Sequence, residues 1–194
     1  MIRSIGSMTA RPLIIFDLEF TAWEGSVARH WLGPGEFKEV VQIGAVRLGA
    51  DWATGESFDC FVRPRINPQL SDYFENLTGI SNQQLTEEGV AFEEALRRFL
   101  AFADGSFIAA FGRDDLVLEE NVRLYGLKSA PLPPYLNLRD WFDAQGFDTS
   151  RLHSCDIGPL LGVPFEGQTH NALCDARSIA AGISVLLKRG AKLW

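Results

Sequence analysis

The sequence has few cysteines, few histidines and no long apolar run. Its three cysteines, Cys60, Cys155 and Cys174, form no Cys-x-x-Cys pair, so neither a zinc knuckle nor a disulfide framework is indicated, and a reducing compartment is favoured. No stretch approaches the roughly 20 apolar residues of a membrane span, and residues 1–12 have no apolar signal core. We therefore expect a cytoplasmic protein that does not bind membranes, with a flexible lead over residues 1–10 and one domain over residues 11–194.

Basic residues are also in deficit. Lys and Arg number 18 against 25 Asp and Glu, a net charge of −7 that argues against a protein coating long nucleic acids. The argument weakens if some of the acids hold divalent cations, because bound metal would cancel part of the charge and change the local field. The hydrophobic share of 46% is typical of a globular chain and excludes a disordered one.

Apolar runs and helical periodicity alternate along the chain. We expect strands at 13–16, within an apolar run that extends to residue 20, and at 40–48, 57–62, 107–111 and 136–138. A hairpin should join the second and third, because residues 49–55 are rich in turn formers. Helical patterns are expected near 91–103, 115–125, 140–144, 152–161 and 172–188. Three strands followed by alternating helices and strands predict an α/β fold with a mixed sheet.

Two acids close the first apolar run. Residues two apart on a strand point to the same face, so Asp17 and Glu19 can converge on one point. Carboxylates this close repel each other unless a cation neutralises them. The pair alone is common, and a solvated strand end would also account for it.

A histidine and an acid lie where the last helix begins. Five residues turn a helix by about 500°, which leaves His170 and Asp175 about 140° apart, so they cannot share a helix face. They converge only if His170 precedes the helix and Asp175 lies in its first turns. The helix N-terminus would then favour neutral imidazole, the form that can act as a base. We also expect the loop of His170 to let it turn away from the carboxylates.

A further acid follows the fourth expected strand. In Phe111-Gly112-Arg113-Asp114-Asp115 the strand breaks at a glycine and two acids begin a helix. Taken alone, both acids could simply be helix caps. The combination of Asp-x-Glu, Gly-x-x-Asp and His-x4-Asp indicates a metal-dependent hydrolase, with Asp115 as the additional ligand.

These three motifs, in this order, resemble the DEDDh, or DnaQ-like, 3′–5′ exonucleases of the ribonuclease H-like fold. The resemblance covers about residues 13–188 and includes 39–46 as a second strand and Leu77-Thr78-Gly79-Ile80 as a nucleotide-stacking turn. Residues 152–175 look most like the branch of histone-mRNA and small-RNA trimming exonucleases and KapD-like proteins. Thr21-Ala22 departs from the two threonines usual in proofreading members, which weakens a DNA-proofreading role. The fold implied is a central mixed five-stranded sheet flanked by helices.

The resemblance also implies a mechanism. Two divalent cations, Mg²⁺ or Mn²⁺, would assist hydrolysis at the free 3′ ends of single-stranded RNA or DNA, with RNA weakly favoured, and nucleoside 5′-monophosphates would be released. Asp17, Glu19 and Asp175 would hold the metal beside the attacking water, Asp17 would bridge to the second metal, and Asp115 would support that metal through waters. His170 would be the general base. Substrate contacts are expected from Glu19, Phe20, Leu77, Thr78, Ile80 and His170.

Some features leave alternatives open. Residues 22–38, with Trp23, Arg29, His30 and Trp31, could stack and steer a single strand, or simply pin a long connection to the core. Leu77, Thr78 and Ile80 could equally be a hydrophobic plug. We assign structural roles to His153, Cys155 and Cys174. Two other functions compete with the exonuclease: a phosphodiesterase for very short oligonucleotides, and a catalytically silent module that binds nucleic acid or a protein.

Overall fold

The computed structural model describes residues 11–128 and 131–193, and the expected lead over residues 1–10 lies outside them. Its centre is one five-stranded sheet with strand order β3-β2-β1-β4-β5. The strands are β1 (Leu13–Phe20), β2 (Val40–Leu48), β3 (Thr54–Phe61), β4 (Phe107–Ala110) and β5 (Tyr135–Asn137). The first three pair antiparallel and β1, β4 and β5 pair parallel, which confirms the predicted mixed sheet and its β2–β3 hairpin.

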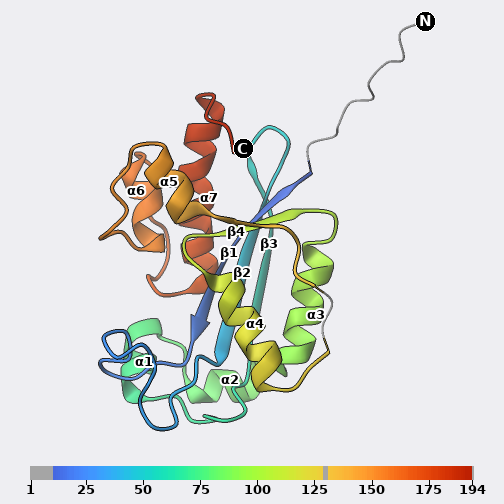
Figure 1. Cartoon of the computed structure of the whole chain (residues 1–194), viewed down its shortest axis with the longest axis vertical. Coiled ribbons are helices and arrows are strands. Elements are labelled where there is room, and N and C mark those ends of the chain that lie inside the picture. The colour runs from blue at the N-terminus through green and yellow to red at the C-terminus, as the bar shows by residue number, and fades with distance from the viewer. Residues whose placement is uncertain (1–10, 129–130, 194) are drawn as a thin grey trace, which may run out of the picture.

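Helices cover both faces of the sheet (Figure 1). Those of the chain's middle are α3 (Phe92–Phe102) and α4 (Asp114–Leu124), and those of its last part are α5 (Leu138–Ala144), α6 (Ile157–Leu160) and α7 (Ala172–Lys188). Two short helices, α1 (Asp72–Thr78) and α2 (Asn82–Glu88), lie beyond one end of the sheet. Within the described ranges, no helix has both the length and the apolar character of a membrane span.

Strand β1 separates the two main apolar clusters. Its even-numbered residues, such as Ile14 and Phe16, pack in the cluster that includes α3 and α4, whereas Leu13 and Ile15 pack in the cluster that includes α7. Because side chains alternate along a strand, Asp17 and Glu19 continue the odd-numbered row and face the side of α7. The two acids are therefore carried to the beginning of the last helix.

Helix α7 begins unusually close to β2. A Cβ atom on Gly44 would lie 2.1 Å from the backbone nitrogen of Leu173, so only glycine permits this approach. The neighbouring Gln42 is fully buried; its Oε1 accepts the N–H of Ala172 at 3.0 Å, and its Nε2 donates to Asp59 at 2.8 Å. These contacts fix the N-terminus of α7, with Asp175 in its first turn.

The fold departs from prediction in two places. The segments α1 and α2 were not predicted as helices; each is seven residues long and begins after a serine cap, Ser71 or Ser81. The single helix predicted over 152–161 is a 3₁₀ turn, η1 (Ser154–Asp156), followed by the one-turn helix α6.

Candidate active site

Three of the predicted site residues meet at the end of β1. Ligand atoms of Glu19, His170 and Asp175 all lie within 4.8 Å of one another. Asp17 and Glu19 are buried, and so is Asp175. The convergence of residues far apart in the sequence, which the motifs predicted, is thus present in the structure.

The acids of this cluster repel one another in a buried setting. Burial, followed by the charges of nearby acids, raises the pKa values of Asp17 and Glu19 well above their usual range. Burial likewise raises the pKa of Asp175 to about 7. Its Oδ1 is buried and has no hydrogen-bond partner in the described part of the chain. Such an orphaned oxygen, among acids that burial destabilises, is the environment that a bound cation would relieve.

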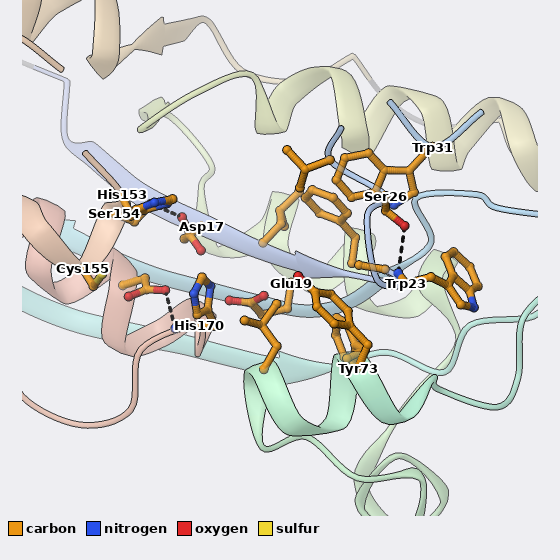
Figure 2. Close-up of a pocket in the computed structure, with 17 residues that line it drawn as sticks. Asp17, Glu19, Trp23, Ser26, Trp31, Tyr73, His153, Ser154, Cys155 and His170 are labelled. Atoms are coloured by element: carbon orange, nitrogen blue, oxygen red, sulfur yellow. Dashed lines mark hydrogen bonds between the residues drawn. The ribbon is translucent and has the colours of Figure 1, made fainter. Parts of the chain in front are cut away.

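His170 precedes α7 and holds a left-handed backbone, with φ of 59°. A left-handed backbone is costly for a residue other than glycine. The backbone N–H of His170 donates to Oδ2 of Asp175 at 3.0 Å. Burial, then the charge of His153, lowers the pKa of His170, which favours the neutral imidazole. The expectation that His170 turns away from the acids is wrong, because a ring nitrogen lies within 4.8 Å of carboxylate oxygens of Glu19 and Asp175. Figure 2 shows the ring beside Glu19.

A serine outside the predicted motifs holds Asp17. The hydroxyl of Ser154, in η1, donates to Oδ1 of Asp17 at 2.8 Å and lowers the pKa of that carboxyl against the larger effect of burial. The ring of His153 lies 6.3 Å from that of His170. His153 and Cys155 were given only structural roles and Ser154 none, because the bond of Ser154 to Asp17 is a contact across 137 residues that no local pattern reveals.

Two neighbouring acids, Asp114 and Asp115, begin helix α4, and the motif predicts Asp115 as the fourth acid of the site. Asp115 is engaged by Arg113, whose Nε and Nη2 donate to its two oxygens at 2.9 and 2.8 Å. After burial, the charge of its neighbour Asp114 is one of those, together with that of Asp175, that raise the pKa values of Asp17 and Glu19. Burial raises the pKa of Asp114 itself to about 7. These shifts connect Asp114 to the acid cluster, and the role of Asp115 as a ligand stays a prediction.

A cavity of about 400 Å³ opens beside the acids. His153, Ser154 and Cys155 lie near Asp17 at one end, and Trp23, Ser26, Trp31 and Tyr73 lie beyond Glu19 at the other (Figure 2). The cavity is thus polar at the acid cluster and largely aromatic beyond it. This combination suits a ligand with a charged group and a flat ring.

Comparison with known proteins identifies the family of this chain. The chain matches the family described as Exonuclease over residues 14–182. It belongs to that exonuclease family.

Among its relatives, the probable 3′–5′ exonuclease KapD of Bacillus subtilis is 31% identical over 117 residues, which cover 59% of this chain and 54% of KapD. The mouse 3′–5′ exoribonuclease 1 is 27% identical over 93% of this chain and 54% of its own length. The chain spans about half the length of these two relatives.

A solved structure places the chain more narrowly. The nuclease domain of 3′hExo, a DEDDh family member bound to rAMP, superimposes with a TM-score of 0.79 at 25% identity and 94% coverage of both chains. The chain is thus a member of the DEDDh 3′–5′ exonuclease group, with the ribonuclease H-like fold predicted for it.

Only part of the predicted stacking turn, Leu77-Thr78-Gly79-Ile80, lines the cavity of this exonuclease homologue. Leu77 lines the cavity together with Phe20. Thr78 and Ile80 are buried: the hydroxyl of Thr78 donates to the carbonyl of Phe74 at 2.9 Å, and Ile80 packs in a small apolar cluster. The expected substrate contacts of Thr78 and Ile80 are therefore corrected to the plug alternative, since core packing covers both side chains.

In the connection over residues 22–38, likewise, some of the predicted substrate-contacting residues line the cavity and others do not. Trp23 and Trp31 line the cavity, and the indole N–H of Trp31 donates to the carbonyl of Thr21 at 2.8 Å. Arg29 is instead held in an ion pair with Glu36, and His30 is exposed and does not line the cavity. The two tryptophans of the predicted strand-steering segment thus line the cavity, whereas its Arg29 and His30 do not.

Proposed function

We propose that this protein is a metal-dependent 3′–5′ exonuclease that removes nucleoside 5′-monophosphates from the free 3′ ends of single-stranded nucleic acid, with RNA favoured over DNA. The observation that carries the proposal is the convergence of Asp17, Glu19, His170 and Asp175 on one cavity. Relatives named exoribonucleases support the preference for RNA. We keep the cytoplasm as the proposed location.

The residues fit a pair of divalent cations. The cluster offers carboxylate oxygens and one imidazole, the donors that suit Mg²⁺ or Mn²⁺, and the unpartnered Oδ1 of Asp175 is an additional free donor atom. Asp17, Glu19 and Asp175 would hold the cations, together with an acid of the Asp114-Asp115 pair. When bound, two such ions supply charge neutralisation and activation of water for an in-line phosphoryl displacement.

The protein's own groups have distinct tasks. His170 is favoured in the neutral form and would accept the proton of the attacking water at its free ring nitrogen. The Ser154 hydroxyl fixes one oxygen of Asp17. Phe20, Leu77 and the two tryptophans give the terminal base an apolar enclosure without base-specific donors, so the enzyme would accept any base.

The test is hydrolysis of 5′-labelled single-stranded RNA and DNA of one sequence, with Mg²⁺, Mn²⁺ or EDTA. We expect a ladder that shortens from the 3′ end, requires metal and is slowed by a 3′-phosphate. Asp17→Asn should reduce cleavage to background, and His170→Ala should reduce it by about 10²- to 10⁴-fold. Asp104→Asn, which changes an exposed acid outside the site, is the matched control.

Three results would contradict the proposal in different ways. Cleavage of dinucleotides without shortening of long strands would indicate the short-oligonucleotide phosphodiesterase. Binding of the labelled strand without cleavage under any metal would indicate the silent module. Equal rates with and without the 3′-phosphate would exclude the 3′–5′ direction.

A further inference from the structure

Some of the described arginines are neutralised by acids, whereas other basic residues form no ion pair with a described acid. Six arginines form ion pairs: Arg29, Arg47, Arg97, Arg98, Arg113 and Arg123. Lys38, Arg63 and Arg65 form none with any described residue. In a chain with a net charge of −7, basic side chains left without acidic partners are available for an external anion.

Lys38 lies at the margin of the acid cluster. Its Nζ lies 4.7 Å from the ring centre of Trp31 and 5.9 Å from that of Phe20, and both rings line the cavity. Its charge lowers the pKa of Asp114 against the larger effect of burial. Cation–π contacts therefore hold one positive charge between the cavity wall and Asp114.

A buried acid, Glu39, links the segment of Arg65 to the segment of Lys38. Glu39, the next residue, accepts the backbone N–H groups of Arg65, Ile66 and Asn67 at 2.8, 2.7 and 2.6 Å. The 65–67 loop is thus fixed beside Lys38. The guanidinium carbon of Arg65 lies 4.6 Å from the ring centre of Tyr125, and an arginine stacked on a ring keeps its N–H edge for an anion.

Arg63 and Arg65 are exposed and share a second cavity, of about 250 Å³. Glu93 is the one acid among its described lining residues, which are Arg63, Pro64, Arg65, Ala91, Phe92, Glu93, Tyr125 and Leu127. Its polar lining consists of the guanidinium groups of Arg63 and Arg65, the carboxylate of Glu93 and the hydroxyl of Tyr125. The two guanidinium groups match phosphate oxygens.

We propose that Lys38, Arg65 and Arg63 form a basic row that binds the backbone phosphates of the substrate strand on the 5′ side of the bond that is cut. This inference rests on the proposed exonuclease function. The terminal nucleotide fills the aromatic cavity, which Asp114 does not line. In the proposed path the remaining strand leaves past Lys38, whose Nζ lies against the Trp31 ring of the cavity wall.

The test compares the double variant Arg63→Gln/Arg65→Gln with the wild type on a dinucleotide and a ten-nucleotide RNA, over a range of salt concentrations. We expect the KM for the longer RNA to rise about three- to tenfold, with unchanged hydrolysis of the dinucleotide, which is too short to reach the row. The slope of log KM against log salt should become shallower by about 1.4, or about 0.7 per lost phosphate contact on a single strand. The control, Arg97→Gln/Arg98→Gln, removes the same charge from the exposed face of α3.

Binding without catalysis separates this inference from the proposed function. In EDTA, fluorescence anisotropy of the labelled ten-nucleotide RNA should show weaker binding for the double variant than for the control. Equal loss in the control, or equal effects on the dinucleotide and the longer RNA, would overturn the basic row. A wild type that binds RNA through the row but cleaves neither substrate would overturn the exonuclease function and leave the row intact.

Discussion

At the scale of single residues, the two oxygens of Asp175 have different environments. Oδ2 accepts the N–H of His170, whereas Oδ1 is buried without a partner in the described ranges. A buried acceptor left unsatisfied destabilises the fold by about 1–3 kcal/mol. The residue that serves the proposed chemistry therefore reduces the stability of the metal-free protein.

Asp175→Asn should stabilise the metal-free protein and abolish cleavage. The amide keeps an acceptor for the His170 N–H and removes the buried charge, so we expect a gain of about 1–3 kcal/mol in the free energy of unfolding. Urea denaturation in EDTA measures it. Asp104→Asn, at an exposed position, should change nothing, and a less stable Asp175→Asn protein would contradict the account.

The pH dependence of stability has a definite sign. The pKa values of Asp114 and Asp175 are raised to about 7, from about 4 in the unfolded chain, so the folded state binds more protons between these values. The resulting stability is complete below about pH 4 and is lost as the pH rises through about 7. The Tm in EDTA should therefore fall between pH 5 and pH 8, and Asp175→Asn should flatten this fall. A Tm that rises over this range in EDTA would show that other groups dominate.

The two neighbouring acids of α4 can be told apart. Asp114→Asn should reduce cleavage more than Asp115→Asn, because the charge of Asp114 acts on Asp17 and Glu19 while Asp115 is engaged by Arg113. Initial rates at saturating Mn²⁺ decide between them. A larger loss in Asp115→Asn would favour the assignment from the Gly-x-x-Asp motif.

Sequence reasoning reached the acids whose position follows from regular geometry. Strand alternation placed Asp17 and Glu19 on one face, and helical rotation placed His170 before α7 and Asp175 within it. It chose Asp115 from the Gly-x-x-Asp spacing, and it could not foresee that Arg113 contacts that carboxylate. It also missed Ser154, since its bond to Asp17 joins distant parts of the chain.

At the scale of elements, the close packing of α7 on β2 aligns the two halves of the site. Gly44→Ala would place a methyl group 2.1 Å from the Leu173 nitrogen and force α7 outward. We expect a loss of about 1–3 kcal/mol in stability, as for overpacked cores, and a larger proportional loss of cleavage. Chemical denaturation and rate measurements on the same samples test this.

The control for that substitution is Gly55→Ala, in the neighbouring strand β3. The nearest atom to its added methyl group would be the Arg47 carbonyl oxygen at 3.4 Å, an ordinary contact. Its stability should stay within about 0.5 kcal/mol of the wild type. Similar losses in both variants would mean that α7 is not held by the Gly44 approach.

Long periodic elements were predicted well and short ones poorly. Strand β2 and helices α3 and α7 match their predicted ranges to within a residue at each end, and β1 begins where predicted but continues through the whole apolar run to Phe20. The short helices α1 and α2 were missed, because seven residues show too little periodicity and such helices depend on tertiary packing. The predicted helix over 152–161 failed for a related reason: Gly158 and Pro159 allow only one helical turn after η1.

At the scale of the whole molecule, the acid cluster couples folding to divalent cations. Ligand at 100 times its Kd stabilises a protein by about 2.7 kcal/mol, which in a domain of this size raises the Tm by about 5–10 °C. We expect Mn²⁺ or Mg²⁺ to produce such a shift relative to EDTA at pH 8. The shift should be smaller at pH 5, where the acids hold protons.

Asp17→Asn provides the control for this effect, because it removes one proposed ligand without changing the shape of the side chain. Scanning calorimetry of both proteins with and without metal measures the difference. An equal metal-induced shift in the variant would locate the binding outside the acid cluster.

The site draws its acids from strand β1 and from helix α7, more than 150 residues later in the chain. During synthesis, Asp17 and Glu19 therefore emerge from the ribosome long before Asp175. A nascent chain that has not reached α7 lacks His170 as well, so it could not carry out the proposed hydrolysis on the messenger being translated beside it. The order of the elements thus delays the proposed nuclease activity until translation of the domain is nearly complete.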